Sequence, residues 1–275
     1  MSEVCPGQMD SYVHGYSERE AERLHDQANA VRELLHHDTA YPPGALILEA
    51  GCGVGAQTVT LARRNTGARF VSVDISLDSL RQAQKLAASC GLTNVYFQQA
   101  DIFALPFAEE AFDHLFVCYV LEHLSDPSGA LAALRRVLKE AGSITVIEGD
   151  HGSCYFYPQT PEAMHVWNCL IQVQARPGGN SLIGRELYPL LKRAGFREPH
   201  ISPRMVYCDS SKPALMEGFV AKTITPMVEG AREQALQMGL TDKATWARGI
   251  RQLYQLAASE QSTFCYTFFK ATAVK

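Results

Sequence analysis

The sequence predicts an α/β protein built on a doubly wound, mostly parallel sheet with a helical insertion. Apolar runs such as ALILEA (45–50), RFVSVD (69–74) and SITVIE (143–148) lack polar alternation, as expected of strands covered on both faces. These runs alternate with amphipathic helical segments, which is the pattern of a parallel sheet. A glycine-rich turn, EAGCGVG at 49–55, joins the first run to a helix and indicates a nucleotide-like ligand.

The elements before residue 150 follow a regular order. Residues 17–37 carry apolar side chains at helical spacing, with a capping-box pattern at Ser17 and Glu20 and a Pro-Pro-Gly stop at 42–44. The other expected elements are strand 45–50, helix 55–64, strand 69–74, helix 76–90 ending at Gly91, strands 94–99 and 112–119, helix 127–139 and strand 143–149.

The regular alternation of predicted strands and helices ends after residue 150. Residues 151–160 are rich in aromatic side chains and predict a loop. Helices follow at 161–175 and 183–196, then a strand at 197–207, helices over 211–260 and a final strand in STFCYTFFKATAVK (262–275). A helical block of that size before the last strand predicts an insertion that covers the active edge of the sheet.

We therefore expect three parts in the chain. An N-terminal arm and helix, 1–43, would cover the binding site, and residues 44–150 would form the ligand-binding core. The remainder, 151–275, would complete the sheet and carry substrate-covering insertions at 151–182 and 209–260.

Composition limits the classes of function. The chain has 275 residues, 47% of them hydrophobic, with a net charge of −4 and a pI of about 6.1. It has no long Lys/Arg run, so no nucleic-acid partner is expected. The eight cysteines show no zinc-like spacing, which predicts buried thiols in a reducing cytoplasm and no metal site. No apolar run approaches ~18 residues and the start lacks a signal-peptide pattern, so neither a membrane span nor export is expected.

The glycine turn alone permits two interpretations. Gly51-x-Gly53-x-x-Ala56 fits a dinucleotide fingerprint, whereas Glu49 followed by glycines at 51, 53 and 55 fits enzymes that use S-adenosylmethionine. Ligands of open α/β sheets bind beyond the carboxyl ends of the strands, so the residues after each predicted strand are informative.

Two acids follow later strands. Asp74 ends the second strand and suits two ribose hydroxyls in either ligand, while Ser76 is the expected cap of the next helix. Asp101 and the apolar Ile102 suit an adenine amino group and its ring. A dinucleotide dehydrogenase has no general need for that second acid, so Asp101 favours S-adenosylmethionine.

With these residues in place, the chain resembles the class I S-adenosylmethionine-dependent methyltransferases over residues 44–150. The resemblance rests on EAGCGVG (49–55), Asp74, ADI (100–102), LPFAEEAFDHLFVCYVLEHLSDP (105–127) and LRRVLKEAGSITVIEGD (134–150). It is strongest to the branch that methylates small molecules such as quinones and sterols. Glu140-Ala141-Gly142 departs from the usual Pro-Gly-Gly turn of that family.

The resemblance implies a Rossmann-like sheet of seven strands whose last strand, in FCYTFFKATAV (264–274), runs antiparallel to the rest. It also implies the residues that hold the methyl donor. Gly51 and Gly53 would line its methionine moiety, and Asp74 would hold its ribose. The full expected cofactor set is Glu49, Gly51, Gly53, Gln57, Asp74, Ile75, Asp101, Ile102, Cys118 and His123.

Methyl transfer is an in-line displacement, so the protein must hold a nucleophile in a closed pocket and needs a base only where the nucleophile loses a proton. Glu148, Asp150 and His151 follow the strand 143–149 and are the expected catalytic residues. His151 is the preferred base because imidazole transfers protons near neutral pH; a structural loop hydrogen bond is its alternative role. The expected substrate wall is Tyr12, Tyr16, Tyr155, Phe156 and Trp167.

The expected function is methyl transfer from S-adenosylmethionine to a small hydrophobic or aromatic molecule. Carbon on an indole-like or prenylated secondary metabolite is favoured over oxygen or nitrogen. An NAD-dependent oxidoreductase leaves Asp101 and VLEHL (120–124) unexplained, and a non-catalytic S-adenosylmethionine-binding protein is a third class. The N-terminal arm is also a candidate contact for a homo-oligomer.

Overall fold

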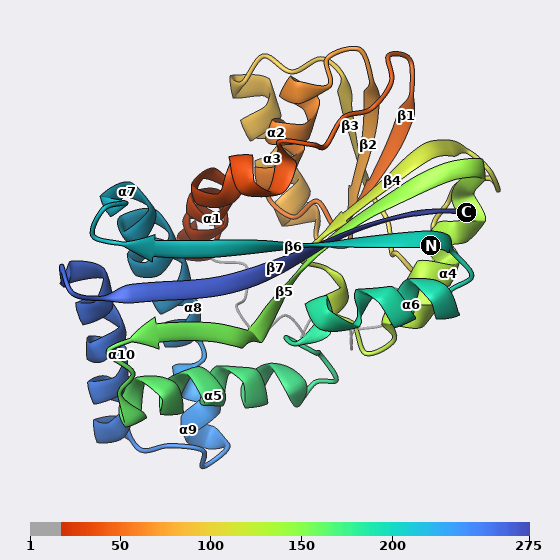
Figure 1. Ribbon diagram of the computed structural model, residues 1–275. Helices are drawn as coiled ribbons and strands as arrows, with labels where there is room; N and C mark the ends of the chain where they lie inside the picture. Colours follow the sequence, from red (N-terminus) through yellow and green to blue (C-terminus); the bar gives the residue numbers. More distant parts are fainter. Residues whose placement is uncertain (1–17) are drawn as a thin grey trace.

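The fold is built on one sheet of seven strands. A computed structural model describes residues 18–275, with side chains from Arg23 onward. The strands, in their order across the sheet (Figure 1), are β3 (Val95–Gln99), β2 (Arg69–Asp74), β1 (Leu46–Ala50), β4 (Phe112–Cys118), β5 (Leu138–Tyr157), β7 (Thr263–Val274) and β6 (Arg197–Asp209). Strands β1 to β5 are parallel, and β7 runs antiparallel to both of its neighbours. This confirms the predicted antiparallel last strand.

Helices lie on both sides of the sheet, with α1 to α3 on one side of β1 to β4 and α4 and α6 on the other (Figure 1). The helical elements are α1 (Glu18–His36), α2 (Ala56–Arg64), α3 (Leu77–Ser89), η2 (Leu121–His123), α4 (Pro127–Val137), α5 (Pro161–Ala175), η3 (Ile183–Glu186), α6 (Leu187–Arg193), α7 (Pro213–Leu215), η4 (Met216–Ile224), α8 (Thr225–Gly230), α9 (Arg232–Gln237) and α10 (Lys243–Ala258). Among these residues no helix is both long and apolar enough to cross a membrane.

Strand β1 shows why its sequence lacks polar alternation. Ile47 packs in a buried layer with Leu35 of α1, while its neighbour Leu48 packs on the opposite face with Leu131 of α4. All four side chains are fully buried, and burying a side chain of this size contributes about 1.5–3 kcal/mol. Both faces of the strand therefore require apolar residues.

Local signals set several helix ends. The Ser76 hydroxyl accepts a hydrogen bond from the Ser79 amide and caps α3, as predicted. Asp126 caps α4 by accepting from the Gly129 amide at 2.8 Å, and a proline occupies the first turn of that helix. Such caps contribute about 1 kcal/mol each, which is why these boundaries are readable in the sequence.

The segment 151–160 is not the loop that the sequence predicted. Strand β5 continues to Tyr157 and pairs Phe156 with Phe264 of β7, after a register shift between Asp150 and Tyr155. Phe156 is 5% exposed, whereas Tyr155 is 66% exposed and Tyr157 64%. This is the period-two pattern of a strand with one covered face.

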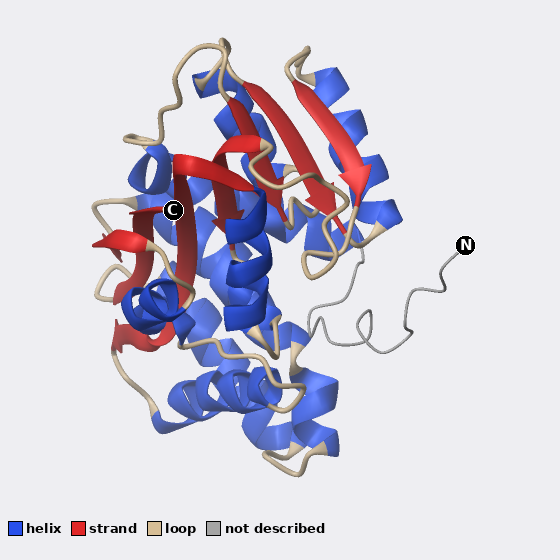
Figure 2. Cartoon of the chain, turned by 90° about the vertical axis from the view of Figure 1, so that its right-hand side faces the viewer, coloured by secondary structure: helices blue, strands red, loops and turns tan. Residues whose placement is uncertain are grey.

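Most of the helices after residue 160 cover that one face, whereas α6 packs with α4 on the other side. Helices α5, α9 and α10 lie at one end of the molecule, below the strands (Figure 1 and Figure 2). Helix η4 is a π-helix, and its Phe219 lies edge-on to Phe264 and Phe268 of β7, with ring centroids 6.1 and 5.9 Å apart. Trp167 of α5 and Trp246 of α10 are each 1% exposed. The helical block is thus a packed layer of the core.

Candidate functional site

The carboxyl end of β1 turns sharply at its glycines. Gly51, Gly53 and Gly55 have φ values of 75°, 52° and 82°, a region that residues with a Cβ rarely adopt. The Gly51 amide donates to the Val73 carbonyl at 2.8 Å, which holds the turn against β2. A Cβ on Gly51 would lie 2.4 Å from Val120 Cγ2, whereas a Cβ on Gly53 would have nothing within 4 Å. Gly53 therefore faces open space, while Gly51 allows close packing.

Asp74 lies beside this turn at the end of β2. Its Oδ2 accepts from the Gly53 amide at 2.8 Å, and its Oδ1 accepts from the Ser76 amide at 2.9 Å. Burial raises the pKa of Asp74, although these backbone donors oppose the rise. The carboxylate and the half-buried Ile75 after it thus have fixed positions next to Gly53.

Glu49 lies beneath the turn. It is 2% exposed, and its Oε2 accepts from Thr58 Oγ1 at 2.7 Å and from Ser72 Oγ at 2.6 Å. Burial raises the pKa of Glu49 to about 7, although both hydroxyls oppose the rise. Glu49 therefore links β1, α2 and β2 and orients the glycine turn from below.

Asp101 and Ile102 follow β3, the strand next to β2. The Ala100 amide donates to the Asp74 carbonyl at 3.1 Å, which brings the two acids to the same edge of the sheet. Asp101 Oδ1 accepts from the Phe103 amide at 2.9 Å, and Ile102 packs partly buried against the core. The carboxyl ends of β1, β2 and β3 thus form one line.

Gln57 connects this turn to α1. Its Oε1 lies 2.8 Å from His36 Nε2, which donates to it. His36 is fully buried, and burial lowers its pKa to about 4, so the ring is neutral and Nδ1 accepts from Thr39 Oγ1. Among the predicted cofactor residues, Gln57 is the one that joins α1 to the turn.

The end of β4 is held by Glu148 of β5. Glu148 is fully buried, and its Oε1 accepts from the Val120 amide at 3.0 Å and the Leu121 amide at 2.8 Å. Burial, together with the nearby Glu122, raises its pKa. The structure therefore places Glu148 as an anchor of η2, and Cys118 lies buried just before that helix.

A cavity of about 50 Å³ opens beside η2. It lies among α1, the end of β4, the middle of β5, η2, the helices α5, η4 and α8, and β7. Its lining residues are Arg23, Leu24, Gln27, Tyr119, Glu122, His123, Gly149, His151, Gln174, Thr223, Ile224, Met227, Tyr266 and Phe268. Polar side chains such as Glu122 and His151 share this wall with apolar ones such as Ile224 and Met227, so the cavity is suited to a ligand with both apolar and hydrogen-bonding parts.

His151 lies in this wall and is 4% exposed. Its Nδ1 lies 2.8 Å from the Tyr266 hydroxyl, and its backbone carbonyl accepts from Trp167 Nε1 at 2.9 Å. Burial lowers its pKa to about 4, although the Glu122 carboxylate opposes this. Its Nε2 is buried and has no hydrogen-bond partner among the residues that the structure describes. The ring is therefore neutral and fixed by its other nitrogen.

Asp150 has a different environment. Its Oδ2 and Oδ1 accept from Arg185 Nε and Nη2, each at 2.8 Å, and Oδ1 also accepts from the Gly152 amide at 3.0 Å. This bidentate pair occupies both carboxylate oxygens. Asp150 is not among the lining residues of the cavity, unlike its neighbour His151.

The residues predicted to form the substrate wall do not lie together. Tyr155 points to solvent, Phe156 stacks on Phe264 at 6.2 Å, and Trp167 supports His151 from behind. None of the three lines the cavity. Tyr12 and Tyr16, with the rest of the N-terminal arm, lie outside the described residues.

The aromatic residues that do line the cavity are Tyr119, Tyr266 and Phe268, which the sequence interpretation missed. Tyr266 and Phe268 alternate with outward residues in β7, so period-two spacing was the available signal. Tyr119 has a φ of 58°, which turns the chain out of β4 toward η2.

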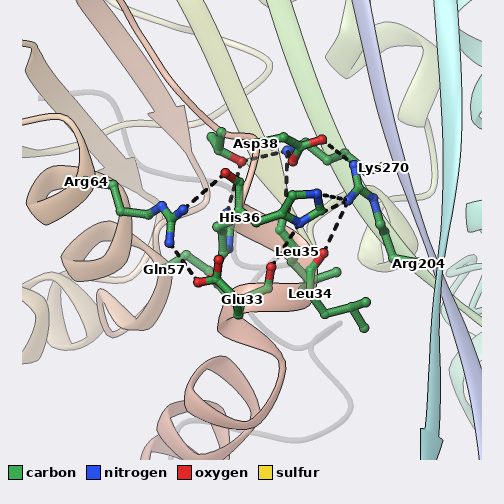
Figure 3. A network of polar contacts seen from close by, with 11 residues as sticks. Glu33, Leu34, Leu35, His36, Asp38, Gln57, Arg64, Arg204 and Lys270 are labelled. Carbon is green, nitrogen blue, oxygen red and sulfur yellow. Dashed lines mark hydrogen bonds and ion pairs between the residues drawn. The ribbon is translucent and has the colours of Figure 1, made fainter.

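Helix α1 is fixed above the cavity by a polar network at its carboxyl end (Figure 3). Lys270 of β7 is 4% exposed and donates to the Leu35 carbonyl and to Asp38 Oδ1, while Arg204 of β6 pairs with Asp38 Oδ2. These contacts hold the helix that supplies Arg23 and Gln27 to the cavity.

The sheet order, the antiparallel β7 and the ligand turn after β1 define a Rossmann-like, S-adenosylmethionine-dependent methyltransferase fold. A family model described as a methyltransferase domain matches residues 43–195, more than half of the chain. The chain therefore belongs to the methyltransferase-domain family, whose members take their methyl group from S-adenosylmethionine.

The relatives that match this chain carry different names. An uncharacterized methyltransferase of Schizosaccharomyces pombe is 33% identical over 150 residues, 51% of this chain and 52% of that one. An O-methyltransferase of Aspergillus sclerotiorum is 30% identical over 156 residues, 56% of this chain and 55% of that one. The chain thus spans about half the length of the curated relatives it matches.

Among solved structures, phosphoethanolamine N-methyltransferase 2 of Haemonchus contortus has a TM-score of 0.59. It is 14% identical to this protein, and the match covers 99% of this chain and 61% of that one. At this identity the likeness shows the fold alone.

Proposed function

We propose that the protein transfers a methyl group from S-adenosylmethionine to a hydroxyl group of a small molecule held in the cavity beside η2. His151 is the base that takes the hydroxyl proton. The buried His151 and Glu122 in the cavity wall support this oxygen acceptor over the carbon acceptor that the sequence favoured.

The carboxyl edge of β1 to β3 fits the methyl donor. Gly53 leaves open space where a side chain would stand, and the half-buried Asp74 beside it presents a carboxylate to ribose hydroxyls. Glu49 and Asp74 place two carboxyl groups at the turn. They suit a cationic sulfonium ligand better than the pyrophosphate of a dinucleotide, because a bound cation favours their ionised forms whereas an anion opposes them. When bound, S-adenosylmethionine supplies an electrophilic methyl group.

The observation that carries the proposal is the environment of His151. Its Nδ1 is engaged by Tyr266, its Nε2 is buried without a described partner, and its neutral form dominates well below neutral pH. A base with these properties accepts a proton from a ligand hydroxyl without competition from bulk water. Glu122 lies on the same cavity wall, and its negative charge favours the imidazolium form of His151.

The deciding experiment supplies methyl-labelled S-adenosylmethionine with an extract of the source cell and identifies labelled products by mass spectrometry. We expect a labelled small-molecule methyl ether, and its loss in His151→Gln. His200→Gln, an exposed histidine on β6, is the matched control. Labelled protein or nucleic acid, or no labelled product at all, would contradict the proposal.

A thermal-shift comparison separates the oxidoreductase alternative. We expect S-adenosylhomocysteine to raise the melting temperature and NAD to leave it unchanged. The reverse pattern would favour the dinucleotide interpretation of the glycine turn.

A further inference from the structure

A buried carboxylate oxygen and a buried imidazole nitrogen line the same cavity and lack a hydrogen-bond partner within the described part of the chain, as does the Tyr119 hydroxyl beside them. The carboxylate oxygen is Glu122 Oε2 and the imidazole nitrogen is His151 Nε2. His151 is 4% exposed, and the side chain of Glu122 is 11% exposed. The two residues come from different elements, β5 and η2, and their charges interact across the cavity.

The other atoms of both side chains are engaged. His151 Nδ1 meets the Tyr266 hydroxyl at 2.8 Å, and Glu122 Oε1 lies 3.6 Å from His123 Nε2. Burial raises the pKa of Glu122, while His151 and Arg23 act in the opposite direction. His151 and Arg23 thus offset part of the effect of burial on the Glu122 carboxyl group.

Buried acceptors without donors are costly, so a ligand or water must satisfy both atoms. A volume of about 50 Å³ holds about four water molecules at ~10–15 Å³ each. The space therefore admits one polar end of a molecule, with hydrogens directed at two points of the wall. An acceptor molecule with a single hydroxyl would leave one of the two atoms to a water molecule.

We infer that the methyl acceptor presents two polar hydrogens to this cavity, one hydroxyl bound by Glu122 Oε2 and a second hydroxyl deprotonated by His151 Nε2. This inference rests on the proposed function and names its substrate class, a dihydroxy compound. As the new O–CH3 bond forms, the S–CH3 bond breaks and its electron pair stays on sulfur. The hydroxyl proton moves to Nε2.

Single methylation follows from the same geometry. Once His151 has released the proton it gained, the methylated product has no hydrogen to offer Nε2, so it satisfies only one of the two acceptors. It therefore binds more weakly than the dihydroxy compound and leaves the cavity after one transfer.

The test measures binding without turnover, by calorimetry in the presence of S-adenosylhomocysteine. The probes are phenol and the three dihydroxybenzenes, which differ only in the presence and position of a second hydroxyl. We expect at least one dihydroxybenzene to bind about tenfold more tightly than phenol, the value of one hydrogen bond to a charged group. In Glu122→Met this preference should fall to about twofold or less, with phenol binding unchanged, since one net hydrogen bond is lost.

Glu122→Gln keeps the shape and should weaken the preference partly, and Glu260→Gln, an exposed residue, should leave it intact. The inference is overturned if phenol binds as well as every dihydroxybenzene, if no dihydroxybenzene binds, or if both Glu122 variants keep the wild-type preference. Should the variants misfold, the wild-type comparison alone decides. Failure of the proposed function is distinct, because it shows as the absence of a labelled methyl ether.

Discussion

Lys270 of β7 donates to Asp38 Oδ1 at 2.6 Å and so joins the last strand to the end of α1 (Figure 3). The two ends of this ion pair differ in burial, since the Lys270 side chain is 4% exposed and that of Asp38 is 43% exposed. Burial works to raise the pKa of Asp38, but hydrogen bonds from Lys270 and Arg204 outweigh it and hold the pKa well below its usual range. The pKa of Lys270 is lowered instead, because burial outweighs its attraction to Asp38. The buried ammonium therefore depends on this ion pair more than the exposed carboxylate does.

The first prediction follows from this asymmetry. Asp38→Asn leaves a buried ammonium without its counter-ion, and should lower the free energy of unfolding by about 1–3 kcal/mol, less than for a fully buried pair. Lys270→Met removes the buried charge and should cost less. Urea unfolding at pH 7 measures both, with the exposed Asp78→Asn as control. Equal costs for the two variants would contradict the prediction.

The stability lost in Asp38→Asn should depend on pH in a defined direction. An aspartate with a depressed pKa stabilises the fold above its unfolded pKa of 3.8, and that contribution is lost as the pH falls further. The stability gap between wild type and Asp38→Asn should therefore be constant from pH 5 to 8 and shrink below about pH 4. A gap that widens on acidification would show that Asp38 does not act as an ionised partner.

The contribution of Glu49 to the stability of the fold should change with pH in the opposite direction. Its pKa rises from 4.5 to about 7 in the folded protein, so its contribution is fully present below pH 4.5 and is lost as the pH rises through 7. Relative to Glu49→Gln, the wild type should lose roughly 3 kcal/mol of stability over that range, at ~1.4 kcal/mol per pKa unit. Denaturant titrations at pH 5, 6, 7 and 8 check this, and a difference that does not vary with pH would refute it.

The glycine turn allows a matched comparison. Gly53 and Gly239 both have positive φ, 52° and 67°, and a Cβ at either position meets nothing within 4 Å. Alanine at each position costs about 1–2 kcal/mol in backbone strain. Only Gly53→Ala should also weaken S-adenosylhomocysteine binding, by about tenfold or more, since its methyl group occupies ligand space. Calorimetry separates the effects; equal affinity in both variants would place the ligand elsewhere.

Tyr266 should act on turnover through His151. Tyr266→Phe removes the hydroxyl that holds Nδ1 and should lower kcat about tenfold while donor affinity stays unchanged, as expected for the loss of one hydrogen bond. The exposed Tyr188→Phe is the control. Wild-type kcat should be flat from pH 8 to 6 and fall toward pH 4, where His151 gains its proton. A kcat that is unaffected in Tyr266→Phe would remove this residue from the mechanism.

The glycine turn and the acidic residues at the strand ends, which we propose hold the methyl donor, could be located from the sequence because their signals are local. Positive-φ glycines, the Ser76 cap and acids at strand ends lie within a few residues of the elements they serve. The cavity beside η2 could not be predicted from the sequence, because it depends on contacts between segments that are far apart in the chain. His151 meets Tyr266 across 115 positions, and Lys270 meets Asp38 across 232. The sequence did contain a local signal for the strand that was mistaken for a loop at 151–160. Buried Phe156 alternates with exposed Tyr155 and Tyr157, but the aromatic content of the segment obscured this pattern.

Arg23 and Phe268 line one cavity, although they stand near opposite ends of the described chain. A ribosome makes β1, β2 and β3 before β7, so the glycine turn proposed to bind the methyl donor is synthesised before the cavity proposed for the acceptor is complete. Strand β7 closes that cavity with Tyr266 and Phe268, and its Lys270 secures the helix made at the start. Under the proposed function, the protein can therefore bind an acceptor only once β7 has joined the sheet.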